Sequence, residues 1–239
     1  MTSKTSTHFS YSSTELDGMA EARNYYRWVM ACFTPYLGKH VVEIGAGRGT
    51  FSELLLNNAD IAELILVEPA DNLFPLLQER FSGNSRVKLV HGYGTEKLDA
   101  SGSPDSVVLV NALEHVPSDE NLLETIYRTL APKGTVLLLA PALPFLYGSL
   151  DEAFGHARRY TKPMLASKLE RAGFHLERLH YLNFPGVVSW FLAGKIFRWR
   201  TLQPASVRTY DRWVVPWISK IEMYWKPVIG QSLIAVARK

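Results

Sequence analysis

The sequence contains a single cysteine, Cys32, among its 239 residues. One thiol cannot form an internal disulfide, which is usual for a protein of a reducing compartment. Long apolar runs are also lacking: the longest, 184–194, is about half of what a membrane-spanning helix requires. Residues 1–14 are rich in Ser and Thr and lack the apolar centre of a signal peptide. These absences predict a cytoplasmic protein with a flexible tail at 1–14.

The chain also lacks a large excess of either positive or negative charge. The chain has 26 Lys and Arg against 23 Asp and Glu, a net charge of +3, which gives no reason to expect nucleic acid as a partner. The positive charge is uneven, because 195–226 holds seven basic residues against only Asp211 and Glu222. Five histidines show no metal-ligand spacing, so no metal is expected: they are His8, His40, His91, His175 and His180.

Short apolar runs alternate with helical patterns along most of the chain. The runs are continuous rather than alternating, which is typical of strands in a parallel sheet that is covered on both faces. They are expected at 40–44, 63–67, 86–91, 106–110, 135–139, 175–184 and 230–239. Helical patterns lie near 15–37, 50–58, 71–81, 118–130 and 163–172, and a loop is expected at 141–161. This order predicts an α/β fold with a doubly wound, mostly parallel sheet and helices on both faces.

The first strand ends in a glycine-rich turn, Gly45-Ala46-Gly47-Arg48-Gly49. Glycines let the backbone turn sharply and approach a ligand closely. An acidic residue, Glu43, lies within the strand. Another, Glu68, ends the second strand about twenty residues after the turn, where a carboxylate can accept hydrogen bonds from both hydroxyls of a ribose. The turn therefore suits an adenosine-containing cofactor, although an ordinary turn that needs glycine for packing has the same sequence.

These residues resemble the class I S-adenosylmethionine-dependent methyltransferases. Val41 to Gly49 resembles their first motif, Asn111-Ala-Leu-Glu-His-Val their Leu-Glu-His stretch, and Leu130 to Leu139 the approach to their fifth strand. The resemblance implies a seven-stranded sheet with a reversed final strand, and S-adenosylmethionine as cofactor without a metal. It also implies a cofactor site comprising Tyr25, Tyr26, Glu43, Gly45, Ala46, Gly47, Glu68, Pro69, Gly94, Thr95, Asn111, Ala112, Leu113 and His115. The runner-up, an NAD(P)-dependent oxidoreductase, would have a third glycine where Thr50 stands.

A dense polar cluster, Asp151-Glu-Ala-Phe-Gly-His-Ala-Arg-Arg-Tyr160, follows the fifth strand. It resembles a Leu-Tyr-Gly to Gly-His-x-Arg-Arg-Tyr stretch of one bacterial, small-molecule branch of this family. Methyl transfer requires an aligned acceptor and, where the acceptor carries a proton, a base, for which histidine is suited. We predict that His156 is the base or orients the acceptor, with Tyr160 assisting. The predicted substrate contacts are Tyr147, Arg158, Arg159 and Trp190. Alternatively, Asp151, Arg158 and Arg159 only lock the loop.

The segment 185–229 is an aromatic and basic insertion that holds five of the six tryptophans. It is expected to be a helical lid over an apolar pocket, within a single domain at 15–239 whose residues 15–38 form a cap helix. A homodimer interface and a peripheral membrane contact remain open. The expected substrate is a small apolar or aromatic molecule of the natural-product type. The alternatives are a lipid or lipid-linked acceptor and a cofactor-binding protein that does not methylate. Nucleic acid is not expected, because the fourth strand is not followed by an Asn-Pro-Pro-aromatic sequence.

Overall fold

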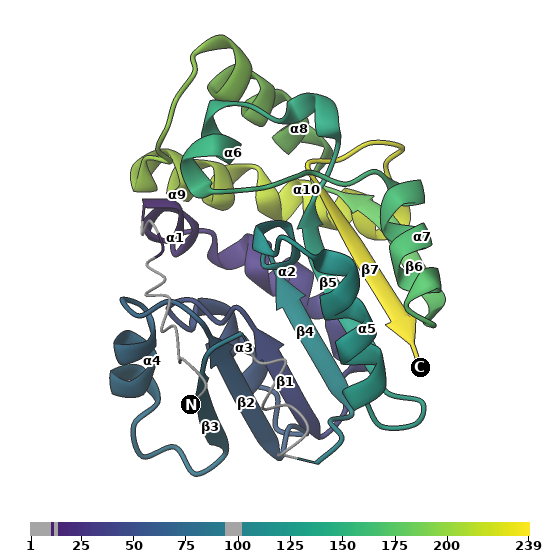
Figure 1. Ribbon diagram of the computed structural model, residues 1–239. Coiled ribbons are helices and arrows are strands. Elements are labelled where there is room, and N and C mark those ends of the chain that lie inside the picture. Colours follow the sequence, from purple (N-terminus) through teal and green to yellow (C-terminus); the bar gives the residue numbers. More distant parts are fainter. Residues whose placement is uncertain (1–10, 12–13, 94–101) are drawn as a thin grey trace, which may run out of the picture.

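A computed structural model describes residues 11, 14–93 and 102–239. In these residues the strands form one seven-stranded sheet, ordered β3-β2-β1-β4-β5-β7-β6 (Figure 1). β7 runs antiparallel to both of its neighbours, β5 and β6, and the other pairs are parallel. The predicted doubly wound sheet with a reversed final strand is confirmed. The strands are β1 (His40–Ile44), β2 (Glu63–Glu68), β3 (Val87–His91), β4 (Ser106–Val110), β5 (Thr135–Pro141), β6 (His175–Leu182) and β7 (Ser232–Arg238).

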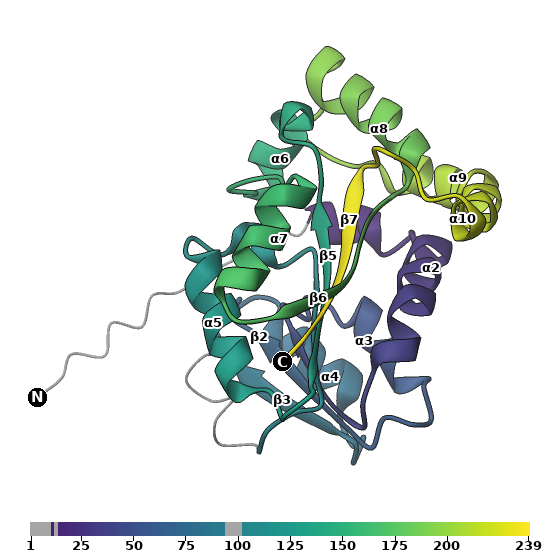
Figure 2. The same cartoon turned by 90° about the vertical axis from the view of Figure 1, so that its right-hand side faces the viewer.

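Helices cover both faces of the sheet (Figure 2). One face packs against α5 (Asp119–Thr129) and α7 (Lys162–Arg171), and the other against α2 (Arg23–Phe33), α3 (Thr50–Leu56) and α4 (Phe74–Phe81). Successive strand residues point to opposite faces, so Val41 and Val42 belong to different cores. The continuous apolar runs seen in the sequence follow from this burial on both sides.

The expected helix at 15–37 is divided. A short helix, α1 (Thr14–Met19), precedes α2, and η1 (Thr34–Tyr36) follows it. The start of α2 is stabilised from a distant part of the chain, because the carboxylate of Asp211 accepts hydrogen bonds from the backbone N–H groups of Asn24 and Tyr25. The expected loop at 141–161 likewise contains η4 (Pro144–Leu146) and α6 (Ser149–Phe154).

The insertion is helical and lies beyond the carboxyl ends of the parallel strands (Figures 1 and 2). It comprises α8 (Phe184–Phe191), a π-helical turn η5 (Leu192–Ile196), α9 (Pro204–Trp213) and α10 (Val215–Tyr224). The buried carboxylate of Glu222 accepts hydrogen bonds from Asn183 N and Phe184 N, so α10 caps the start of α8. α9 contacts both α1 and α2. No helix in the described residues is long and apolar enough to cross a membrane.

Candidate active site

The glycine turn is anchored to the neighbouring strand. The backbone N–H groups of Gly45 and Ala46 both donate to the carbonyl of Val67 at the end of β2. Gly45 has a φ of 77°, and a Cβ there would lie 2.7 Å from Cβ of Ala112. Both the left-handed backbone and the contact with the segment after β4 therefore require glycine at this position.

Two buried carboxylates hold the glycine turn and the helix that follows it. Glu68 accepts hydrogen bonds from Gly47 N at 2.7 Å and from Ala70 N at 2.8 Å. Glu43 accepts a hydrogen bond from the Ser52 hydroxyl of α3. Burial raises the pKa of Glu43 to about 8, although the Ser52 hydrogen bond opposes the shift. Glu43 thus fixes α3 relative to β1, and Glu68 lies at the end of β2 with its carboxylate on the backbone of the turn. Its contact with a ribose stays a prediction.

Of the other predicted cofactor residues, Ala112 contacts this turn directly. Asn111, at a positive φ of 48°, directly follows β4, and Ala112 packs on Gly45. His115 lies in η3 (Leu113–His115). Pro69 follows Glu68 and is half-buried. Gly94 and Thr95 lie outside the described residues.

The two tyrosines of α2 have different surroundings. Tyr26 packs edge-on against Phe51 of α3, with ring centroids 5.9 Å apart. The hydroxyl of Tyr25 donates to Ser232 Oγ at 2.9 Å, and both residues line a cavity rather than the glycine turn. The cofactor contacts assigned to them remain predictions.

That cavity has a volume of about 280 Å³ and lies where β4, β5 and β7 meet the insertion. Its walls are largely apolar, formed by Met19, Leu150, Trp190, Leu202 and Val207. The lining also includes charged and polar side chains, among them Glu15, His156, Arg159 and Asn111. An apolar pocket with a few convergent polar groups is typical of a small-molecule site.

His156 is held in this wall by a buried hydrogen-bond network. Its Nδ1 lies 2.9 Å from the carboxylate of Asp151, which also accepts hydrogen bonds from Arg159 Nε at 2.7 Å and Trp190 Nε1 at 3.1 Å. The Tyr147 hydroxyl donates to the backbone carbonyl of His156 at 2.9 Å. The Nδ1 side of the imidazole is therefore fixed by Asp151, and Nε2 is the ring nitrogen that is left to act on a ligand.

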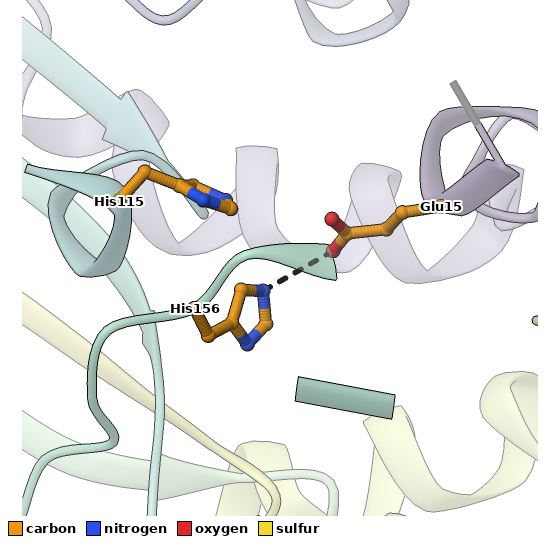
Figure 3. Close-up of side chains that lie close together, drawn as sticks. All are labelled: Glu15, His115 and His156. Atoms are coloured by element: carbon orange, nitrogen blue, oxygen red, sulfur yellow. Dashed lines mark ion pairs between the residues drawn. The ribbon is translucent and has the colours of Figure 1, made fainter. Parts of the chain in front are cut away.

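Nε2 of His156 faces a carboxylate from the first helix (Figure 3). It lies 3.5 Å from Oε1 of Glu15 and 3.9 Å from Oε1 of Glu114. Burial by itself lowers the pKa of His156, but Asp151, Glu15 and Glu114 outweigh it and raise the pKa to about 10. The imidazole is consequently protonated at neutral pH.

Among these buried acidic groups, Glu114 has the fewest hydrogen bonds to offset its burial. It is 0% exposed, and within the described residues no hydrogen bond reaches either carboxylate oxygen. Burial raises its pKa to about 7, against the attraction of His156. Glu15 has a lowered pKa despite its burial, because His156, His115 and Tyr11 favour its charged form. Three carboxyl groups, those of Glu15, Glu114 and Asp151, thus surround His156.

Three of the predicted catalytic and substrate-binding residues, Tyr147, Arg158 and Tyr160, do not line the cavity. Tyr147 supports the backbone of His156 through its hydroxyl, and the other two contact α5. The Tyr160 hydroxyl donates to the carboxylate of Asp119 at 2.9 Å, and the side chain is fully buried. Arg158 pairs with the same carboxylate at 3.0 Å and donates to two backbone carbonyls. Both side chains therefore brace the loop against α5. Arg159 reaches the cavity wall but is paired with Asp151, which corresponds to the loop lock considered from the sequence.

The structure also shows site residues that were not predicted. Glu15, Glu114 and Asp151 surround His156, and only the last two lie in motifs that the sequence made conspicuous. Glu15, His115 and His156 bring ligand atoms within 4.8 Å of one another, a set that could also hold a metal ion. The imidazole of His115 stands edge-on to that of His156, with ring centroids 4.9 Å apart.

A family model described as "Methyltransferase domain" matches residues 19–179. A segment of 52 residues is 38% identical to ribosomal RNA small subunit methyltransferase A of Geobacter metallireducens, but it spans only 22% of this chain and 18% of that relative.

Solved structures are similar over nearly the whole chain. An S-adenosylmethionine dependent methyltransferase from Mesorhizobium loti aligns with a TM-score of 0.60 and 15% identity, over 94% of this chain and 100% of that chain. The [4+2]-cyclase SpnF aligns with a TM-score of 0.58 and 12% identity, over 91% of this chain and 81% of that chain. At these identities the likeness shows the fold.

Proposed function

The chain belongs to the methyltransferase domain family, and we propose that it transfers the methyl group of S-adenosylmethionine to a small apolar or aromatic acceptor. The observation that carries this proposal is the cavity of about 280 Å³, whose lining combines apolar side chains with His156, Glu15 and Arg159. Asn111 connects the glycine turn with the cavity, because it directly follows β4, the neighbour of β1, and also lines the cavity.

The residues of the turn fit the cofactor. Glu68 ends β2 with a buried carboxylate, Gly47 leaves the backbone open at a φ of 57°, and Gly45 lets the segment after β4 approach. In this proposal Glu68 holds the ribose, and the backbone at Gly45 to Gly47 holds the methionine part. When bound, S-adenosylmethionine supplies a methyl group on a positively charged sulfur.

His156 is the group of this chain that is placed to hold the acceptor's proton. Its Nδ1 is held by Asp151, so Nε2 is the atom that can receive that proton. With a pKa of about 10 the imidazole is already protonated when the site is empty of other cations. A cation bound nearby lowers the pKa of a histidine, because like charges repel. In this proposal a bound cation lowers the pKa of His156, so that the imidazole gives up its proton to solvent more readily and can then receive the proton of the acceptor.

Glu15, Glu114 and Asp151 complete this arrangement. Together they favour a positive charge at the site in addition to that of Arg159, whether it is on His156 or on a bound cation. A cluster that stabilises the charge wherever it lies suits a reaction that begins with a cationic donor and ends with a released proton. Arg159 keeps Asp151 ionised and in place.

Two other functions have an observation in their favour. The exposed apolar side chains of α8 and α10 favour a lipid or lipid-linked acceptor at a membrane surface. The likeness to the [4+2]-cyclase SpnF favours a protein that binds the cofactor without methylating. Methyl transfer to an acceptor in the cavity is supported more directly, because His156 faces the cavity.

The test begins with calorimetric titration of the purified chain with S-adenosylhomocysteine, and with NAD as control. We expect one-site binding of the former alone. Incubation with labelled S-adenosylmethionine and a panel of apolar hydroxyl- and amine-bearing acceptors should then give a methylated product. Cofactor binding without a methylated product from any class of acceptor would favour the non-methylating function, and NAD binding would remove the cofactor assignment.

A further inference from the structure

The outer surface of the insertion is unusually apolar. Among the described residues, fourteen of the eighteen exposed large apolar side chains lie between Phe184 and Val228. They recur at helical spacing along one side of α10, where Trp217 is 69% exposed, Ile221 54% and Trp225 59%. α8 repeats the pattern with Phe184 and Val188. Such contiguous apolar surface on a folded chain marks an interaction site.

The exposed charge on the same elements has one sign. All seven basic residues of 195–226 are exposed, whereas both acidic residues are buried. The acids serve internal roles, since Asp211 caps α2 and Glu222 caps α8. Among the described residues, Arg208 is the one cation of this segment that forms an ion pair with an acidic side chain, that of Glu21. The basic residues are Lys195, Arg198, Arg200, Arg208, Arg212, Lys220 and Lys226.

Cations and aromatic rings are interleaved on this surface. The Lys220 ammonium lies 5.8 Å from the ring centroid of Trp217, and the Arg212 guanidinium 5.5 Å from that of Trp213. Tryptophan with neighbouring Lys or Arg is the composition of helices that lie in the interface of a bilayer, with the rings among the headgroups and the cations at the phosphates.

We propose that the outer face of α8, η5, α9 and α10 docks this protein on a bilayer that contains anionic lipids. The helices lie together at one end of the molecule, so they can approach a surface at the same time (Figures 1 and 2). A second copy of the chain is a poorer occupant, because a symmetric contact would place one positive face against another. An anionic lipid surface complements both the apolar side chains and the charge.

Docking in this way would bring the cavity close to the lipid. α8 exposes Val188 on the outer face and buries Trp190 in the cavity wall. An acceptor dissolved in the membrane would then reach the cavity through the same group of helices. This consequence rests on the proposed methyl transfer, whereas the docking itself does not.

The test is co-sedimentation of the full chain with vesicles of phosphatidylcholine and phosphatidylglycerol, compared with phosphatidylcholine alone. We expect binding to the anionic vesicles that weakens with added salt. The double variant Trp217→Ser, Ile221→Ser should reduce partitioning about tenfold or more by removing the α10 stripe. Lys220→Glu should reduce it about fivefold or more.

Matched controls lie on other faces of the molecule. Leu76 of α4 and Met164 of α7 are each 40% exposed, and Leu76→Ser with Met164→Ser should leave partitioning unchanged. Unaltered binding of S-adenosylhomocysteine would show that each variant is folded. The proposal is overturned by absent binding to anionic vesicles, or by equal binding of the Trp217 and Ile221 variant. It is also overturned if that variant converts a dimer to a monomer in sedimentation velocity. Failure of the parent chain to bind S-adenosylhomocysteine would overturn the proposed function alone.

Discussion

Asp151 is the residue on which the geometry around His156 depends. Its two carboxylate oxygens accept hydrogen bonds from His156, Arg159, Trp190 and the backbone N–H of Gly148. A fully buried carboxylate with this many donors stays ionised, and the pKa of Asp151 is lowered although burial alone would raise it. It fixes both the tautomer and the direction of the imidazole, which is how a carboxylate supports a histidine that moves protons.

Replacing His156 tests that role directly. His156→Gln keeps a side chain that can donate toward Asp151 but cannot accept a proton, so turnover should fall about a hundredfold. Affinity for S-adenosylhomocysteine, measured calorimetrically, should hardly change. His175→Gln, on the exposed side chain that begins β6, is the control. Undiminished turnover would remove His156 from the mechanism. Turnover lost with a chelator and restored by a divalent ion would show that Glu15, His115 and His156 hold a metal.

The same variant gives a prediction for stability against pH. The pKa of His156 rises from 6.5 to about 10 in the folded chain through Asp151, Glu15 and Glu114, which outweigh burial. Its protonation therefore stabilises the fold fully below pH 6.5, and this contribution is lost as the pH rises toward 10. In urea unfolding without cofactor, the parent chain should have the higher unfolding free energy at and below pH 6.5. Its advantage over His156→Gln should shrink as the pH rises toward 10. Parallel pH curves would contradict this account of the imidazole's charge.

At the scale of elements, the glycine turn combines two constraints that a pair of substitutions can separate. Gly45 and Gly83 share a φ of 77°, but a Cβ would lie 2.7 Å from Ala112 at the first and within 4 Å of nothing at the second. Gly83→Ala should cost about 1 kcal/mol in unfolding free energy from backbone strain alone. Gly45→Ala should cost more, because Ala112 must move, and should weaken S-adenosylhomocysteine binding severalfold. Equal effects on stability and binding would show that the contact with the segment after β4 is unimportant.

Elements were predictable from the sequence where their signals are local. The strands were found because continuous apolar runs report burial on both faces, and β1 and β4 begin and end at the expected residues. The division between α1 and α2 could not be predicted, because the group that caps α2 is Asp211, which is remote in sequence. In the same way His156 stood out within its own loop, whereas its partner Glu15 comes from α1. Only the fold brings the two together.

At the scale of the whole molecule, α1 is the element that connects the separate parts of the site. Glu15 pairs with His156, and Asp17 pairs with Arg48 of the glycine turn at 2.5 Å. Leu16 lies against Gly47, and α1 also contacts α9 of the insertion. One short helix thus touches the glycine turn, His156 and the insertion.

This position predicts how α1 responds to the cofactor. A six-residue helix is not stable alone, so its order depends on the surfaces that it joins. A cofactor bound at the glycine turn would add to those surfaces, and opening of α1 should become less frequent. Hydrogen exchange should therefore slow at 14–19 and 45–49 when S-adenosylhomocysteine binds, while 215–224 in α10 serves as the internal control and stays unchanged. Exchange that slows at the turn but not in α1 would mean that the helix does not close on the cofactor, and the charge pairing of Glu15 with His156 would then belong to the acceptor side of the site alone.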